Sequence, residues 1–155
     1  MEIFNFTYVE SPIGPVEIGC SEAGVTALYF VDAPRHPVSD SPLLTAARTQ
    51  IAAYFAGSLT VFDLPLDLRG TEFQRRVWAQ LLTVPFGQTA TYLDIALALG
   101  NPQAVRAVGA ANGQNPVSVI VPCHRIIGSN GKLIGYGGGL WRKEWLLRHE
   151  DALLI

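Results

Sequence analysis

The sequence of 155 residues is short of charge, of cysteine and of long apolar runs. Charged residues make up 15% of it, against about a quarter in an average domain, and no charge block or biased tract predicts a disordered tail. The two cysteines, Cys20 and Cys123, have unlike neighbours, which argues against a disulfide framework and favours free thiols in a reducing compartment. No stretch approaches about 18 uncharged apolar residues, and the N-terminal MEIFNFTYVE lacks the basic segment of a secretory signal. We therefore expect a cytoplasmic protein with no membrane partner.

Hydrophobic residues, by contrast, are plentiful, and the charges are unevenly divided. A hydrophobic share of 49% in a chain of this length predicts a folded protein with a real core. Residues 1–69 hold three basic and eight acidic residues, a net charge of −5, whereas residues 70–155 hold eight basic and five acidic residues, a net charge of +3. This basic excess is compatible with a nucleic-acid surface and equally with an ordinary solvated one, so charge alone does not decide between them.

The first part of the chain predicts a small sheet followed by a helix. The aromatic residues of FNFTY alternate with polar ones, and two further alternating segments, PVEIGC and VTALYFV, flank a Glu-Ala-Gly turn, which is the pattern of a β-hairpin. DSPLLTAARTQIAAYFAG then shows helical periodicity, with Ser41 as cap, Pro42 in the first turn and Gly57 as stop. VFDLPLDL returns to the alternation of a strand. We expect residues 1–70 to form a small α+β module.

Residues 71–155 are predicted to be mainly helical. TEFQRRVWAQLL opens with a capping box from Thr71 to Gln74 and carries apolar residues at helical spacing until Pro85 ends it. The helix predicted in TYLDIALALGN stops at Gly100. A second helix, predicted in NPQAVRAVGAANG, begins at once with Asn101 as its cap. Two short helices joined by a Gly-Asn turn are typical of a helix-turn-helix, whose second helix often enters a DNA groove, although most short helical hairpins are only structural.

The second helix of this pair consists almost wholly of small side chains. Ala107, Gly109 and Ala110 would let its backbone approach another surface closely, and Arg106 is its only charged residue. The other surface is either a neighbouring helix or a nucleic-acid backbone, toward which Arg106 alone would reach.

After this helix the sequence turns to apolar β-branched residues and then to glycines. NPVSVIVP predicts a strand that leads to Cys123-His124-Arg125, and RIIGSNGKLIGY is a hairpin candidate around Asn130-Gly131. GGGLWRKEWLLRHEDALL predicts a closing helix. The glycines before it lack the Lys-Ser/Thr and the βαβ context of a nucleotide loop, and they are more typical of a tight loop beside a ligand.

A cysteine beside a histidine allows four interpretations. A zinc site is disfavoured, because beyond the pair only Cys20, His36 and His149 remain and no Cys-x-x-Cys spacing occurs. A cysteine hydrolase needs a histidine paired directly with the thiol, and the adjacent side chains of Cys123 and His124 point in different directions. A thiolate that attacks an alkyl carbon needs the histidine only to draw the proton away through a water. The fourth interpretation is an inert buried cysteine.

Four motifs taken together resemble one family of DNA-repair proteins. PCHR, the preceding GNPQAVRAVGAANGQNPVSVIV, the YGGG loop and the final RKEWLLRHE resemble the O6-alkylguanine-DNA alkyltransferases, also called methylated-DNA–protein-cysteine methyltransferases. The resemblance is nearly continuous from Gly70 to Glu150 and weaker before it, where SPIGPVEIG and AYFAG are also similar. It implies an α+β protein, with residues 1–70 as a scaffold module and residues 71–155 as a mainly helical DNA-binding alkyltransferase domain.

The resemblance also implies the chemistry. In such proteins O6-alkylguanine, with O4-alkylthymine as a further candidate, is flipped out of duplex DNA, and its alkyl group moves irreversibly to a cysteine of the protein. Cys123 matches the alkyl acceptor, and His124 matches the base that works through a water. Glu150 matches the carboxylate that orients the histidine, and from sequence alone it is expected to be exposed at the end of the last helix. Tyr92 matches the tyrosine that protonates guanine at N3. One transfer per molecule and no cofactor are implied.

The remaining matches concern DNA and the substrate pocket. Arg106 matches the finger that enters the base stack, on a helix that meets the minor groove without sequence preference. Asn115 matches the asparagine that ties this helix to the active-site segment. Val121, Tyr136 and Gly137 are assigned to the pocket, and Gly137 stands where serine occurs in other members. The expected partner is double-stranded DNA carrying alkylated bases, bound by a monomer.

Two departures from related proteins bear on the interpretation. Some members bind a structural zinc in the N-terminal module through two cysteines and two histidines, and here only Cys20 and His36 are available, so we expect no metal. Alkyltransferase-like proteins bind the same lesion and transfer nothing, and they replace the acceptor cysteine. Because Cys123 is retained together with Tyr92, the sequence favours transfer.

Overall fold

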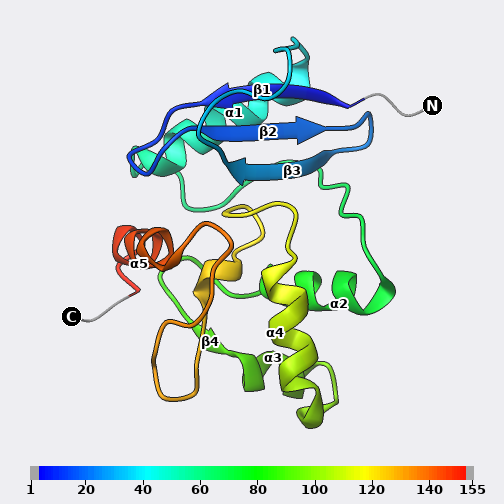
Figure 1. Cartoon of the computed structure of the whole chain (residues 1–155), viewed down its shortest axis with the longest axis vertical. Helices are drawn as coiled ribbons and strands as arrows, with labels where there is room; N and C mark the ends of the chain where they lie inside the picture. Colours follow the sequence, from blue (N-terminus) through cyan, green and yellow to red (C-terminus); the bar gives the residue numbers. More distant parts are fainter. Residues whose placement is uncertain (1–3, 153–155) are drawn as a thin grey trace. The chain divides into compact units, whose positions relative to one another are not determined.

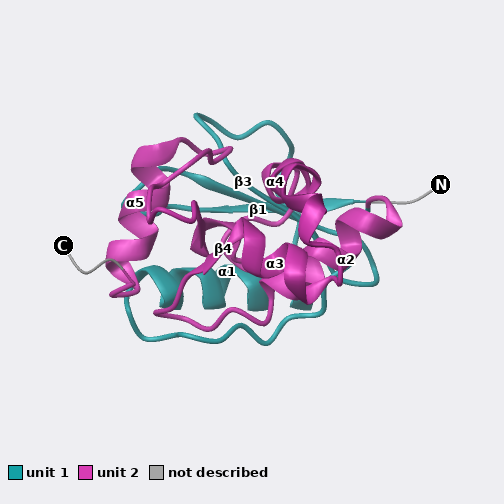
Figure 2. Ribbon diagram, turned by 90° about the horizontal axis from the view of Figure 1, so that it is seen from below, with its two compact units in different colours: residues 1–69 teal, residues 70–155 magenta. Residues whose placement is uncertain are grey.

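The computed structural model describes residues 4–152, and the chain divides into two compact units, residues 1–69 and residues 70–155 (Figure 2). The three-stranded sheet belongs to the first unit, and most of the helices belong to the second (Figure 1). The predicted α+β class, a small sheet-plus-helix module followed by a mainly helical domain, is confirmed.

The first unit is an antiparallel sheet with one helix against it. Its elements, in chain order, are β1 (Asn5–Val9), β2 (Val16–Cys20), β3 (Val25–Phe30) and α1 (Pro42–Phe55). The strand order is β1-β2-β3, and the central strand β2 is buried along its whole length. α1 contacts β1 and β2 through its buried face. It begins as predicted, because the Ser41 side chain accepts a hydrogen bond from the backbone N–H of Leu44.

The strand predicted from VFDLPLDL does not form. Residues 61–68 make only an isolated bridge between Val25 and Leu66. The Val25 N–H donates to the carbonyl of Pro65 at 2.8 Å, and the Asp67 N–H donates to the carbonyl of Val25 at 2.9 Å. Pro65 has no N–H to donate, so the pairing cannot continue on the N-terminal side of Leu66 despite the alternating sequence.

The second unit is built around three helices in mutual contact. Its elements, in chain order, are α2 (Glu72–Leu81), β4 (Ala90–Thr91), α3 (Tyr92–Ala98), the 3-10 turn η1 (Pro102–Ala104), α4 (Val105–Gly113), the 3-10 turn η2 (Cys123–Arg125), β5 (Ile126–Ile127) and α5 (Leu140–His149). The predicted capping box between Thr71 and Gln74 is present on α2. α3 and α4 form the predicted helix pair, although α4 starts only after η1 rather than directly after Asn101. The indole N–H of Trp78 donates to the carbonyl of Ala111 at 2.8 Å, which fixes α4 against α2.

The strand predicted from NPVSVIVP is a compact turn instead. Within residues 115–122 the Val121 N–H donates to the carbonyl of Val117 at 3.0 Å. The side chain of Asn115 closes the turn, because its Oδ1 accepts from the Val117 N–H at 3.0 Å and its Nδ2 donates to the Val121 carbonyl at 2.8 Å. Val119 is fully buried with a φ of 71°, a left-handed conformation that β-branched residues rarely adopt. The apolar run is therefore buried, but apart from a single bridge at Val117 it does not form a strand.

The hairpin predicted around Asn130-Gly131 forms only in part. The turn is present, because the Gly128 N–H donates to the carbonyl of Lys132 at 2.9 Å. The strand before it, β5, pairs in parallel with β4 rather than with the segment that follows the turn. Residues 132–136 have no regular structure and lead toward α5.

Candidate active site

Cys123 opens the 3-10 turn η2, directly after the compact turn at residues 115–122. It is 4% exposed. Burial raises the pKa of its thiol, while the side chain of Asn115 and the positive charge of Lys143 act in the opposite direction. The resting group is therefore the thiol, and it needs a base before it can act as a nucleophile.

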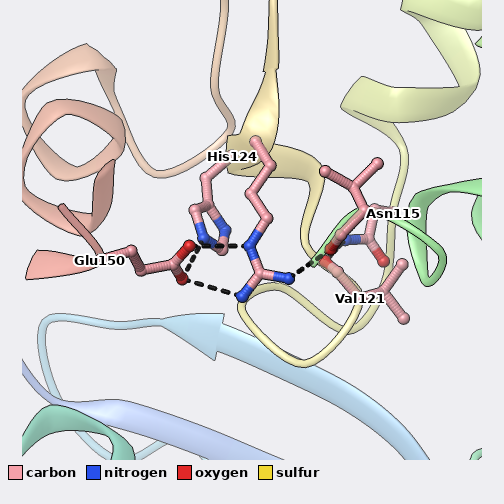
Figure 3. Close-up of polar contacts among 6 residues, drawn as sticks. Asn115, Val121, His124 and Glu150 are labelled. Atoms are coloured by element: carbon pink, nitrogen blue, oxygen red, sulfur yellow. Dashed lines mark hydrogen bonds and ion pairs between the residues drawn. The ribbon is translucent and has the colours of Figure 1, made fainter. Parts of the chain in front are cut away.

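The next two side chains, His124 and Arg125, both contact Glu150 at the C-terminal end of α5 (Figure 3). His124 Nε2 lies 2.8 Å from Glu150 Oε2, and Arg125 donates from Nε to Oε1 at 2.7 Å and from Nη2 to Oε2 at 3.0 Å. Arg125 Nη1 also donates to the carbonyl of Val84 at 2.7 Å. Burial acts to raise the pKa of Glu150, but the hydrogen bonds of His124 and Arg125 outweigh it and hold this pKa well below its usual range. Glu150 is therefore ionised.

An ionised Glu150 fixes which nitrogen of His124 carries the proton. A carboxylate can only accept, so Nε2 donates to it and Nδ1 keeps a lone pair. Nδ1 is buried and has no hydrogen-bond partner among residues 4–152. Burial lowers the pKa of His124 although Glu150 acts against this, so the ring is neutral at pH 7. His124 thus presents a free proton acceptor.

The expectation that Glu150 is exposed is wrong, because this residue is only 1% exposed. α5 buries Lys143, Leu146 and Leu147, and Glu150 continues the same spacing of three and four residues along one face. The end of the helix therefore turns its carboxylate inward rather than to solvent.

The same face of α5 carries a second buried charge, Lys143. Its Nζ donates to the carbonyl oxygens of Ile126 at 2.6 Å, Ile134 at 2.9 Å and Gly135 at 3.4 Å. Three acceptors match the three donors of an ammonium group. Burial lowers the pKa of Lys143 to about 8, which still leaves it mostly protonated at pH 7. Lys143 ties β5 to the loop that precedes α5.

A pocket of about 390 Å³ lies among α3, α4 and this loop. Its lining consists of Tyr92, Val105, Gly109, Asn112, Gly113, Ile134, Gly135 and Tyr136. The volume falls within the usual range for small-molecule sites.

Two tyrosines of this lining keep their phenol protons. Tyr92 donates from its hydroxyl to the carbonyl of Ile134 at 3.0 Å, and burial, assisted by the nearby Cys123, raises the pKa of Tyr92. The Tyr136 hydroxyl is buried without a hydrogen-bond partner in the described part of the chain, and burial raises its pKa well above the ordinary value. Both phenols keep their protons at neutral pH.

Two residues predicted for the pocket are not among those that line it. Val121 is fully buried and contributes its carbonyl to Asn115 rather than a side-chain surface to the cavity. Gly137 is exposed, and a Cβ at this position would meet no atom within 4 Å. Packing therefore does not require glycine there, and a serine side chain would fit.

Four of the five residues expected at the DNA surface lie on α4, and the fifth, Asn115, lies after it in the turn at residues 115–122. Arg106, Ala107 and Ala110 are exposed, and Arg106 has no hydrogen bond or ion pair with any residue in the range 4–152. Gly109 is half-buried beside Tyr92, whose Cδ1 would lie 3.9 Å from a Cβ at this position. The exposed side of α4 thus offers small side chains and one long cation.

Sequence analysis missed three buried polar side chains at this site: Arg125, Lys143 and Asn112. Asn112 is 5% exposed and donates from Nδ2 to the carbonyl of Cys123 at 3.4 Å. The periodicity of the closing helix contains a signal for Lys143, because this residue falls on the apolar face, where a charge needs partners. Asn112 likewise follows buried Val108 by four residues on α4. Arg125 lies outside any α-helix and carries no such signal.

Neither metal ligands nor membrane spans stand out in the part of the chain that the structure describes. Within residues 4–152, no three His, Cys, Asp or Glu side chains are grouped so that they could hold a metal ion. No helix in the same range combines the length and hydropathy needed to cross a membrane. Cys20 and Cys123 are both buried and unpaired.

Comparison with known proteins covers both units. Residues 72–152 match the family model described as 6-O-methylguanine DNA methyltransferase, DNA binding domain, and residues 5–68 match that of the ribonuclease-like domain of the same proteins. The methylated-DNA–protein-cysteine methyltransferases of Mycobacterium tuberculosis and Mycobacterium leprae are 48% and 50% identical to this chain, covering 97% and 95% of it and 94% and 92% of their own length. A crystal structure of Mycobacterium tuberculosis OGT in complex with DNA is 49% identical, covers 96% of this chain and 93% of its own, and superposes with a TM-score of 0.88. The chain therefore belongs to the 6-O-methylguanine DNA methyltransferase family.

Proposed function

We propose that this protein repairs DNA by flipping O6-alkylguanine out of the duplex and transferring the alkyl group to its own Cys123, which restores guanine. The class of reaction is that of the family, the transfer of an alkyl group from DNA to a cysteine of the protein. The observation that carries the residue roles is the unpartnered Nδ1 of His124, the residue after Cys123, with the opposite nitrogen held by the buried Glu150. A proton acceptor of this kind is what activation of a buried thiol requires.

The first step moves the thiol proton to His124. The neutral ring accepts it at Nδ1 through a water, because adjacent side chains point in different directions and a direct transfer is unfavourable. Glu150 then stabilises the imidazolium that forms. The buried ammonium of Lys143 favours the thiolate of Cys123, which burial alone would disfavour.

The second step forms the bond between Cys123 Sγ and the alkyl carbon while the bond from that carbon to O6 breaks. The electron pair of the broken bond stays on guanine, which is a poor leaving group as an anion, so a proton must reach the ring. Tyr92 supplies it at N3, exchanging its hydrogen bond to the carbonyl of Ile134 for one to the base. The tyrosinate then recovers a proton from solvent, and His124 releases the thiol proton to solvent and returns to its neutral form, so no net proton is gained or lost.

DNA is bound by a monomer through the minor groove. Ala107 and Ala110 allow the backbone of α4 to come close to the duplex, and Arg106 is the long cation available to enter the base stack. Contacts to the DNA backbone carry no sequence information, so lesions are bound in any sequence context. Asn115 supports this geometry, because it closes the turn between α4 and Cys123.

The product is a thioether on Cys123. A carbon–sulfur bond of this kind resists hydrolysis, and the side chains described around Cys123 include none that could cleave it. Each molecule therefore acts once, without a cofactor.

Intact-mass measurement after incubation with a duplex containing O6-methylguanine tests the proposal. The protein should gain the mass of one methyl group, and peptide mapping should locate it on Cys123. Cys123→Ala should lose transfer and keep lesion binding, whereas the matched variant Cys20→Ala should transfer normally. Retained transfer in Cys123→Ala, or more than one turnover per molecule, would contradict the proposal. Lesion binding without transfer by the wild-type protein would indicate a lesion-flagging protein, and turnover of esters or peptides would indicate a hydrolase.

A further inference from the structure

The turn at residues 128–132 packs against the wall of the pocket. It is closed by the Gly128 N–H, which donates to the carbonyl of Lys132 at 2.9 Å, and by the side chain of Asn130, which accepts from the Lys132 N–H at 3.1 Å. A Cβ at Gly128 would lie 2.7 Å from Cδ1 of Ile134, a residue of the pocket lining. These contacts fix the position of residue 132 beside the pocket.

Lys132, the last residue of this turn, is an exposed cation without a partner. Its side chain makes no hydrogen bond or ion pair with any residue in the range 4–152. It is also the only charged residue from Gly128 to Gly139, a stretch that otherwise consists of glycine, apolar and uncharged polar residues. Lys132 therefore supplies the whole charge of this wall of the pocket.

The opposite wall of the pocket carries a second cation of this kind. Val105 of α4 lines the pocket, and its neighbour Arg106 is exposed and likewise without a partner within residues 4–152. Figure 1 shows the loop after β5 (orange) and α4 on opposite sides of α3. Because the pocket lies among these elements, one unpaired positive charge flanks it on each side.

A flipped nucleotide brings negative charge to the mouth of this pocket. In the proposed function the base enters the pocket, while its sugar stays joined to the strand by the phosphates on its 5′ and 3′ sides. Each of these phosphates carries one negative charge, and Arg106 is not available to neutralise them if it fills the base stack. An ammonium group suits this task, because it is a compact charge that binds a phosphate oxygen without requiring one fixed geometry.

Resting on the proposed function, we propose that Lys132 binds a phosphate next to the flipped nucleotide and thereby favours the flipped state over binding to intact duplex. The two cations then divide the work, since Arg106 fills the space that the base has left and Lys132 holds the displaced backbone. A phosphate contact carries no sequence information, so Lys132 adds affinity for the flipped state without a requirement for particular neighbouring bases.

The test combines a change in the protein with a change in the DNA. Binding is measured with unreactive Cys123→Ala as the parent, on O6-methylguanine duplexes in which the phosphate 5′ or 3′ of the lesion is replaced by a neutral methylphosphonate. One of the two replacements should weaken binding by about three- to five-fold, and Lys132→Gln should cause a similar loss on the unsubstituted duplex. The two changes together should weaken binding no more than either does alone, because both remove the same contact.

Salt dependence and two control variants complete the test. In Lys132→Gln the slope of log affinity against log salt concentration should become shallower by about one. Lys132→Arg, which keeps the charge, should retain the affinity of the parent. Arg48→Gln removes an exposed cation of α1 that has no partner within residues 4–152, and it should also bind as the parent does.

The possible results separate this inference from the proposed function. Unchanged affinity in Lys132→Gln, or losses that multiply with both methylphosphonates, would overturn the role of Lys132. An equal loss in Arg48→Gln would overturn it by showing that only the overall charge counts, and an equal loss on intact duplex would do so by showing that the contact does not depend on flipping. If the wild-type protein transferred no methyl group from the unsubstituted lesion duplex, the proposed function would fail, whatever the effect of Lys132→Gln on binding.

Discussion

Both carboxylate oxygens of Glu150 accept hydrogen bonds, from His124 and from Arg125. The guanidinium of Arg125 donates two of the three hydrogen bonds and, together with His124, keeps the carboxyl ionised. The ionised carboxyl in turn keeps the proton of His124 on Nε2 and leaves Nδ1 open. A neutral amide at this position would not specify the tautomer, since an amide can donate as well as accept.

Glu150→Gln should therefore slow alkyl transfer much more than it weakens DNA binding. General base catalysis contributes about 10²- to 10⁴-fold, so we expect a loss of at least about 100-fold in the single-turnover rate. Affinity for lesion-containing DNA, measured with unreactive Cys123→Ala as background, should change little. Glu144→Gln, which removes an exposed carboxylate from the same helix, should behave as wild type. Equal losses of rate and affinity would mean that Glu150 is only structural.

At the scale of elements, the sequence predicted those features that residues close together in the chain determine, such as helix starts and apolar helix faces. α1 and α2 begin where Ser41 and Thr71 can cap them, and their apolar faces follow from spacing alone. The turn at residues 115–122 could not be predicted, because a β-branched run favours a strand and the side chain of Asn115 overrides that preference. The burial of Glu150 also escaped prediction, since it depends on partners about 25 residues earlier in the chain. The candidate site is made largely of such long-range bonds, which the family resemblance indicated and periodicity did not.

Lys143 joins a helix, a strand and the pocket loop, and its pKa of about 8 predicts an alkaline limit to the reaction. Above this pH the amine loses one of three donors and the charge that favours the Cys123 thiolate. The single-turnover rate should fall as the pH rises through about 8, although alkaline solution favours free thiolates. Lys143→Arg, whose charge persists, should move the fall to higher pH.

Unfolding does not account for the predicted alkaline fall. Between about 8 and the ordinary value of 10.5 the unfolded chain binds more protons at Lys143 than the folded protein does, so this group makes folding more favourable as the pH rises. Urea unfolding at each pH provides the control. A wild-type rate that keeps rising through this range, with the protein folded, would show that the charge of Lys143 does not matter for transfer.

At the scale of the whole molecule, each unit holds, within residues 4–152, one buried carboxylate that is ionised by its partners. In the first unit Glu17 is 1% exposed, accepts from Arg35 Nη2 at 2.6 Å and from the Tyr8 hydroxyl at 2.8 Å. Burial acts to raise the pKa of Glu17, but these hydrogen bonds outweigh it and lower the pKa. Glu150 plays the same part in the second unit. Both units therefore depend on the ionised form of a group that acid neutralises.

The free energy of unfolding should accordingly fall in acid. A carboxyl whose pKa is lower in the folded protein than its ordinary 4.5 stabilises the fold above pH 4.5, and this contribution disappears as the pH falls through the folded value. His124 adds a loss of stability that begins at higher pH, because its folded pKa lies below the ordinary 6.5 and the unfolded chain takes up a proton first.

Glu150→Gln should lower the free energy of unfolding by about 3 kcal/mol at neutral pH, because it leaves the buried Arg125 charge without its anion. In urea titrations the difference between this variant and wild type should shrink below pH 4.5, whereas the exposed control Glu22→Gln should match wild type throughout. A difference that stays constant down to strong acid would show that the ionisation of Glu150 contributes nothing to stability.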